Sequence, residues 1–216
     1  MGKLFSIDGK AFCFLSSCAD LVVLNILWII CCLPVVTIGA STTALHYVAL
    51  KMAKGEEAYI VKSFFHSFIE NFRQATVIWM SILACAAVLF FDFYYIGHTR
   101  AELAGVLAVV IFFIAILLSI TICYIFPMLS YFKCSTFAAV KNALFMAIAH
   151  LPYTVLLLAL ALLPVGMVLL LPDQLAAVTF LDVIIGFAGC AYVGAFIYHR
   201  IFRNYIPEGI ANESEA

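Results

Sequence analysis

Charged side chains are scarce in this chain of 216 residues, because Lys, Arg, Asp and Glu together make up only 11% of it. An average soluble domain is about a quarter charged and about half apolar, whereas 67% of the residues here are hydrophobic. A soluble fold of this size would lack the polar residues needed to cover so much apolar surface. The composition therefore excludes an ordinary soluble domain and predicts that lipid surrounds most of the chain.

An excess of positive charge is also missing. Eleven Lys and Arg residues against 12 Asp and Glu residues give a formal net charge of −1. No overall basic field is available to attract nucleic acid, so we expect no nucleic-acid partner.

The sequence has eight cysteines but no CxxC pair. Cys31 and Cys32 are adjacent, and no matching His or Cys ligands lie near them in the sequence. Six cysteines fall inside apolar segments, where this residue behaves as a small hydrophobe: Cys18, Cys31, Cys32, Cys85, Cys123 and Cys190. We therefore expect no disulfide framework, no metal site and no cofactor.

Motifs of the common enzyme classes are absent from the sequence. It contains no HExxH, GxSxG, GxxxxGK[ST] or GxGxxG pattern, so the usual metal, nucleophile and phosphate-binding signatures are missing. We expect that the protein is not an enzyme.

Five hydrophobic segments approach the length of about 20 residues that a helix needs to cross a bilayer. They cover residues 21–38, 75–97, 103–126, 151–171 and 176–198. Short polar turns at 98–102 and 172–174 join the second segment to the third and the fourth to the fifth, so these pairs are expected to be antiparallel neighbours. The sequence predicts an all-α fold, a polytopic transmembrane helical bundle that forms one membrane domain over residues 1–216.

Two stretches between the spans show the pattern of an amphipathic helix. In residues 59–74 the apolar positions follow helical spacing: Val61, Phe64, Phe65, Phe68, Ile69 and Phe72. The opposite face carries the candidate partner-docking residues Lys62, His66, Glu70 and Arg73. Residues 135–150 repeat the pattern more weakly. We expect two cytoplasmic interfacial helices, which either dock on a partner or lie in the headgroup layer.

The distribution of Lys and Arg predicts the orientation in the membrane. With five spans, one side holds Lys3, Lys10 and Arg100, and the other holds eight Lys and Arg residues, which places the C-terminus in the cytoplasm. Residues 35–53 leave an alternative open, because this largely apolar stretch after Pro34 could return as a sixth or re-entrant element. The eleven Lys and Arg residues then divide 10 to 1 between the two sides of the membrane, and the N-terminus is cytoplasmic too. Either count predicts a multi-pass protein of the cell membrane.

Polar residues in the spans are the first candidates for function, because charges inside a membrane are energetically costly. Asp20 and Asn25 lie at the start of the first span, and Asp182 lies about two turns into the fifth. The alternatives are a helix cap at the interface for Asp20 and a structural hydrogen bond to another span for Asp182.

A broken, polar segment at the end of the first span includes Pro34, Thr37 and Gly39. Irregular backbone at membrane depth is tolerated only where protein or a water-filled cavity covers it. This segment is therefore a candidate functional element, and a simple hinge is its alternative interpretation.

Small residues recur at i, i+4 and i+8 in the fifth span, at Gly186, Cys190 and Gly194. Such spacing lets another helix approach closely. The partner helix belongs either to the same chain or to a second copy, which would make a homodimer through the fifth span.

Several runs of residues resemble the YesL family of bacterial membrane proteins. They are Ala19-Asp20-Leu21, Leu24-Asn25, the block from Cys32 to Leu45 with its LPxxTxGAxxxAL pattern, and the run from Ser63 to Thr76. The family is a domain of unknown function, common in Gram-positive bacteria and often encoded near genes for carbohydrate uptake and polysaccharide degradation. The resemblance implies a membrane setting and a link to sugar transport, and it supplies no catalytic residues.

Three functions remain open at this level. The first is an accessory protein or subunit of a transport system, most plausibly for carbohydrate, with other transport subunits as partners. The second is a small stand-alone transporter that uses Asp182 and the segment at Pro34. The third is a scaffold for membrane assembly or signalling.

Overall fold

The computed structural model describes residues 10–56, 59–98 and 104–205, and every regular element within them is a helix. In chain order these elements are α1 (Lys10–Cys32), η1 (Val35–Thr37), α2 (Ile38–Ala53), α3 (Ile60–His98), α4 (Ala104–Tyr131), α5 (Thr136–Ala149), α6 (Leu151–Leu170), η2 (Pro172–Gln174), α7 (Leu175–Leu181), η3 (Asp182–Gly186) and α8 (Phe187–Arg203). The short elements η1 and η2 are 3₁₀ turns, and η3 is a π-helical turn.

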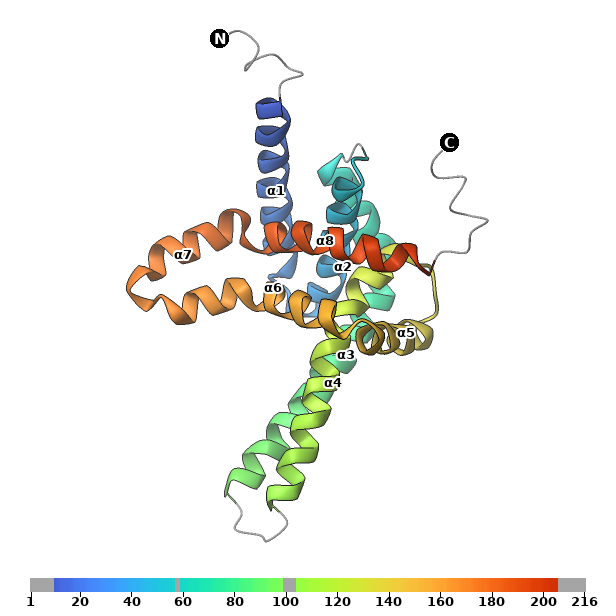
Figure 1. The fold of residues 1–216 in the computed structure, drawn as a ribbon, viewed down its shortest axis with the longest axis vertical. Coiled ribbons are helices and arrows are strands. Elements are labelled where there is room, and N and C mark those ends of the chain that lie inside the picture. The colour runs from blue at the N-terminus through green and yellow to red at the C-terminus, as the bar shows by residue number, and fades with distance from the viewer. Residues whose placement is uncertain (1–9, 57–58, 99–103, 206–216) are drawn as a thin grey trace.

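Helices α1 and α2 form an antiparallel hairpin that turns at Pro34 (Figure 1). Proline lacks an N–H and disfavours helical backbone at the preceding residue, so the chain breaks there. The Thr37 hydroxyl holds the turn, because it is 2.6 Å from the carbonyl oxygen of Cys31 and 2.8 Å from that of Pro34. The segment 35–53, left open by the sequence, is thus a helix that returns along α1.

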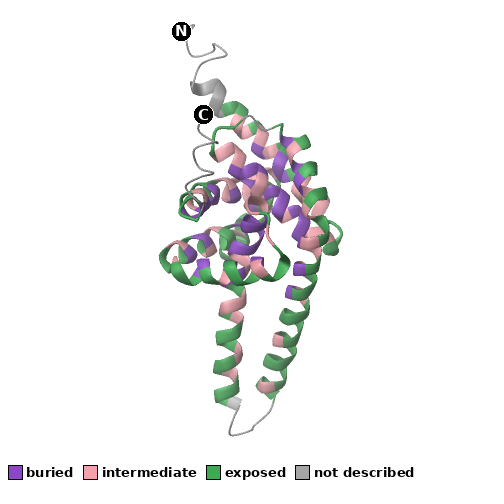
Figure 2. Ribbon diagram, turned by 90° about the vertical axis from the view of Figure 1, so that its right-hand side faces the viewer, coloured by how far each residue is buried: buried purple, intermediate pink, exposed green. Residues whose placement is uncertain are grey.

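Helix α3 is one continuous helix of 39 residues, where the sequence analysis expected an interfacial helix at 59–74 and a span at 75–97. No proline interrupts it, and its one glycine, Gly97, lies at its end. At 1.5 Å per residue the helix is about 58 Å long, which exceeds the roughly 30 Å of a hydrocarbon core. Its first half packs against α2, and its second half extends away from the body beside α4 (Figures 1 and 2).

Helix α4 continues through Pro127 to Tyr131, a few residues beyond the expected end of the third span. Proline cannot donate to the carbonyl four residues earlier, which here belongs to Cys123. The hydroxyl of Tyr198 in α8 donates to that carbonyl at 2.6 Å. Tyr198 is only 4% exposed, and this partly buried hydrogen bond links α4 to α8 at the carbonyl that the proline leaves free.

The buried residues gather in a central body, from which two arms project (Figure 2). One is the α3–α4 arm, residues 83–98 and 104–119, and the other is the α6–α7 arm, residues 158–181 (Figure 1). Large apolar side chains on both arms are exposed, among them Phe90, Phe91, Phe112, Leu169 and Phe180. Exposed apolar patches of this extent indicate a surface covered by lipid.

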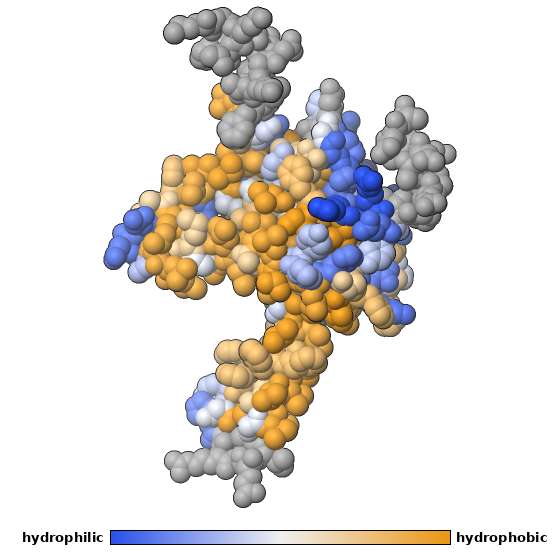
Figure 3. Space-filling view, viewed as in Figure 1, coloured by the Kyte–Doolittle hydropathy of each residue, from blue (hydrophilic) through white to orange (hydrophobic). Residues whose placement is uncertain are grey.

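Within the part of the chain that the structure describes, five helical segments are long and apolar enough to cross a membrane. They are Leu15–Cys32, Ile60–His98, Gly105–Tyr131, Leu151–Leu170 and Pro172–Arg203. The predicted all-α, polytopic helical bundle is therefore confirmed. Figure 3 shows hydrophilic surface at the ends of the two arms and on the right-hand side of the body, with hydrophobic surface between them.

Candidate functional site

Asn25 of α1 makes three hydrogen bonds to the π-helical turn η3 and the start of α8, two of them buried. Its side-chain nitrogen donates to the carbonyl oxygens of Asp182 at 2.9 Å and Val183 at 2.7 Å. Its side-chain oxygen accepts from the backbone N–H of Ala188 at 2.8 Å. The side chain is fully buried, so this amide links α1 to the fifth span inside the protein.

The π-helical turn explains why an amide is needed at this place. A single π turn shifts the i→i−4 pattern and leaves backbone groups without helical partners. Unpaired backbone groups are costly where water is absent. Asn25 supplies two donors to carbonyls of η3 and one acceptor to the N–H of Ala188 at the start of α8. The fifth span is thus broken and repaired at the point where Asp182 begins the turn.

Asp182 is 8% exposed. An added Cβ at Gly186 would lie 2.5 Å from its Oδ1 atom, so the glycine provides the space that the carboxylate occupies. The structure brings together Asn25 and Asp182, which the sequence analysis named separately. Asp20 lies half-buried on α1, about a turn and a half before Asn25.

The segment with Pro34, Thr37 and Gly39 is packed against α3. An added Cβ at Gly39 would lie 2.6 Å from the carbonyl oxygen of Ala75 and 2.7 Å from Cβ of Trp79. The Trp79 indole N–H donates to the carbonyl oxygen of Val35 at 2.8 Å. Pro34 itself is exposed. Leu33, Val35 and Val36 are exposed as well, so protein covers little of this irregular backbone. Gly39 is buried and lets the backbones of α2 and α3 approach each other.

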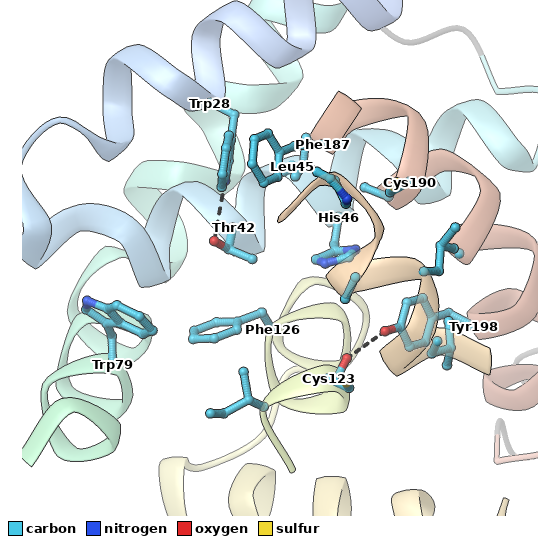
Figure 4. A pocket seen from close by; sticks show the side chains of 17 residues that line it. Trp28, Thr42, Leu45, His46, Trp79, Cys123, Phe126, Phe187, Cys190 and Tyr198 are labelled. Atoms are coloured by element: carbon cyan, nitrogen blue, oxygen red, sulfur yellow. Dashed lines mark hydrogen bonds between the residues drawn. The ribbon is translucent and has the colours of Figure 1, made fainter. Parts of the chain in front are cut away.

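A cavity of about 230 Å³ lies where α1, α2, α3, α4, α6 and α8 converge. Its walls carry five aromatic side chains, Trp28, Trp79, Phe126, Phe187 and Tyr198. The imidazole of His46 in α2 lies among them, with its ring centroid 5.6 Å from that of Tyr198 (Figure 4). Among the described residues that line the cavity there is no Asp, Glu, Lys or Arg.

His46 and its aromatic neighbours were missed by the sequence analysis. The signal that could have indicated them is the helical spacing of Thr42, Leu45 and His46 on the face of α2 that turns inward. The small residues Cys190 and Gly194 also line this cavity, and Gly194 lies 3.5 Å from Leu157 and Leu160 of α6, measured from an added Cβ. These two positions serve contacts within the chain, whereas the space beside Gly186 is filled by Asp182.

The four candidate docking residues on α3, Lys62, His66, Glu70 and Arg73, are all exposed. The opposite face of the same segment is buried against α2 through Ile60, Phe64, Ser67 and Ala75. Of the expected apolar face only Phe64 is fully buried, while Val61, Phe65, Ile69 and Phe72 are 40–72% exposed. The face of α3 that packs against α2 is therefore rotated from the apolar face that the hydrophobic pattern indicates. Small residues on the packed face, Ser67 and Ala75, allow α2 to approach.

Glu70 is the centre of the polar face. Its carboxylate lies 2.9 Å from the ammonium of Lys133, in the linker after α4, and 3.6 Å from Nε2 of His66. The hydrogen bond to Glu70 raises the pKa of Lys133 above its ordinary value. Both partners are solvent-exposed, so the pair contributes little to stability but fixes a pattern of charge on the surface.

No group of three His, Cys, Asp or Glu side chains suited to a metal ion occurs within residues 10–56, 59–98 and 104–205. The chemistry available at the site is hydrogen bonding and apolar contact.

A comparison with protein families gives one match: residues 21–93 match a family described as "Protein of unknown function, DUF624". The matched part includes Asn25, the turn at Pro34, and the candidate docking residues of α3, and it ends before the fifth span. Searches of curated proteins and of solved structures found no match. The match is consistent with a membrane protein of a family whose function is unknown.

Proposed function

We propose that the protein is a non-enzymatic accessory subunit of a transport system in the cell membrane, and that it docks on its partner through the charged face of α3. This face consists of Lys62, His66, Glu70 and Arg73, and it is called the docking row below. The observation that carries the proposal is that the docking row stays exposed while the opposite side of the same segment is buried against α2.

A row of charges at the end of a membrane helix suits a protein partner outside the lipid. Charged residues are depleted from surfaces that face lipid, because burying them there is costly. Further basic residues lie towards the same end of the body, namely Lys51, Lys54, Lys133, Arg200 and Arg203. The excess of basic residues favours a cytoplasmic location for this side, with the C-terminus on it.

The composition of the cavity favours an accessory role over direct carriage of sugar. A sugar carries many hydroxyl groups, and each loses hydrogen bonds to water on entering an apolar site. The described lining residues are almost all apolar. The YesL resemblance implies a link to carbohydrate, and the apolar cavity favours the partner subunit, rather than this chain, as the protein that binds the sugar.

The test of docking is charge reversal at two exposed positions. The variant Lys62→Glu/Arg73→Glu should lose its co-purifying transport subunit in mild detergent, as measured by mass spectrometry. The control Lys141→Glu/Arg200→Glu changes net charge equally at two other exposed positions and should retain the partner. A C-terminal topology reporter must read the same in both variants. Equal retention by both variants, or equal loss, would contradict docking through this row.

The buried carboxylate at a broken helix favours a second candidate function, a stand-alone carrier that uses Asp182. Intramembrane carboxylates often mark ion or proton pathways. In that case purified protein in liposomes should take up a solute, and Asp182→Leu should abolish uptake while the protein still inserts. Removing an aspartate lowers the cost of inserting that helix by about 3 kcal/mol. Lack of uptake by the wild-type protein leaves the accessory role.

A further inference from the structure

We infer that the cavity is a binding site for a small apolar molecule that carries one hydrogen-bonding group. This site is independent of the docking row, because none of the docking residues lines it. The cavity volume is about 230 Å³, and an apolar cavity of roughly 150 Å³ is enough to bind benzene. The expected ligand is therefore of the size of a substituted single ring.

The walls of the cavity determine the apolar part of the ligand. Aromatic side chains from four helices surround the space: Trp28 of α1, Trp79 of α3, Phe126 of α4, and Phe187 and Tyr198 of α8, with His46 of α2 beside them (Figure 4). Ring-on-ring contacts favour an aromatic ligand. A charged ligand would be buried without a counter-ion among the described lining residues, which is strongly unfavourable.

His46 determines the polar part of the ligand. Its Nδ1 atom is buried and has no hydrogen-bond partner. A buried polar group without a partner destabilises the protein, and a ligand that supplies the partner removes this penalty. The neighbouring donors are already engaged, since the Trp28 N–H is 3.4 Å from Thr42 Oγ1 and the Tyr198 hydroxyl is 2.6 Å from the Cys123 carbonyl. Nδ1 of His46 is therefore the buried polar atom among the described lining residues that lacks a partner.

Access to the site runs past α6. Ala161 lines the cavity and is also exposed, so it marks the mouth. The exposed surface of α6 is apolar, which makes lipid the medium from which a ligand enters. An apolar molecule dissolved in the bilayer is concentrated at this mouth.

The test uses tryptophan fluorescence, because the sequence has two tryptophans and both line the cavity. Full-length protein in detergent is titrated with 4-bromophenol, whose bromine quenches nearby indoles, and in parallel with bromobenzene, which lacks the hydroxyl group. Quenching by 4-bromophenol should saturate, with an affinity roughly tenfold higher than that of bromobenzene if the new hydrogen bond contributes about 1.4 kcal/mol.

Variants distinguish binding of the probe in the cavity from its partition into the detergent micelle. Ala161→Phe should fill the mouth and abolish saturable quenching. The matched control Ala159→Phe, on an exposed position of the same helix outside the cavity, should bind as the wild type does. His46→Leu should weaken 4-bromophenol binding by about tenfold and leave bromobenzene binding unchanged. Size-exclusion elution checks that each variant is folded.

Two outcomes would overturn the inference. Quenching that rises linearly and equally in the wild type and Ala161→Phe means that the probes only dissolve in the micelle. Equal affinity for the two probes, unaffected by His46→Leu, means that His46 contributes no hydrogen bond to a ligand.

Discussion

At the scale of single residues, the stability of the fold depends on polar groups that form hydrogen bonds with one another inside an apolar environment. The Tyr198 hydroxyl donates to the carbonyl of Cys123, which Pro127 leaves free. The Asn25 amide bonds backbone groups of η3 and of the start of α8. In both cases the break and its repair come from helices far apart in the sequence. Substitution of Tyr198 or Asn25 should therefore lower the stability of the fold, because backbone groups lose their hydrogen-bond partners.

Asn25→Ala should destabilise the protein strongly, because it leaves two carbonyls and one N–H buried without partners. Two of the three groups take part in buried hydrogen bonds, and each buried group left unpaired costs about 1–3 kcal/mol. The free energy of unfolding should therefore fall by at least about 2 kcal/mol, which corresponds to a fall in Tm of roughly 4–8 °C for a chain of this size. Thermal unfolding in detergent measures the effect. Ile26→Ala, at the exposed neighbouring position, should change Tm much less. An unchanged Tm for Asn25→Ala would show that η3 is satisfied in another way.

Gly39→Ala should also destabilise the fold, for a steric reason. The new Cβ would lie 2.6 Å from a backbone oxygen of α3, and overpacking of this kind costs about 1–3 kcal/mol. Gly166→Ala is the matched control, because nothing lies within 4 Å of its Cβ position and alanine favours a helix. The two substitutions should shift Tm in opposite directions. A shift in the same direction for both would contradict the close contact between α2 and α3.

At the scale of the elements, α3 is the helix whose extent the sequence described least well. The change at residue 75 from an amphipathic to a uniformly apolar pattern looked like a boundary between two helices. A change in surroundings does not break a helix, however, whereas proline and glycine do. The same helix passes from one environment to the other.

The continuity of α3 can be measured with two spin labels, at Lys62 and Ala87, in protein whose native cysteines have been replaced. Both positions are exposed, and 25 residues of straight helix separate their Cα atoms by about 38 Å. A narrow distance distribution near this value is expected. A pair at Lys62 and Arg73, about 17 Å apart along the axis, checks the labelling. A broad or much shorter distribution for the long pair would indicate a hinge near residue 75.

At the scale of the whole molecule, the antiparallel course of α1 and α2 bears on topology. If α2 returns through the membrane, the chain makes an even number of passes and both termini lie on one side. Reporters at Met1 and Ala216 should then both read cytoplasmic, and a cysteine introduced at Arg100 should be labelled from outside. A periplasmic or extracellular reading at Met1 alone would restore the count of five passes. A reversed reading at all three positions would refute the orientation inferred from charge.

The spans were predictable because a bilayer imposes a length and a composition on any helix that crosses it. The packing partners were not, since Asn25 and Asp182 are separated by 157 positions and nothing local connects them. His46 was inconspicuous in the sequence for the same reason. A single polar residue in an apolar helix acquires meaning only from the side chains around it, and those of His46 come from five other helices.

The length of α3 has a mechanical consequence. A straight rod of about 58 Å has no joint between the end that carries the docking row and the end inside the α3–α4 arm. A rotation of about 5° around its midpoint moves each end by roughly 2.5 Å in opposite directions, by the geometry of such a rod. A tilt of the first half of the helix therefore displaces the end in the α3–α4 arm as well, by the stiffness of the helix alone.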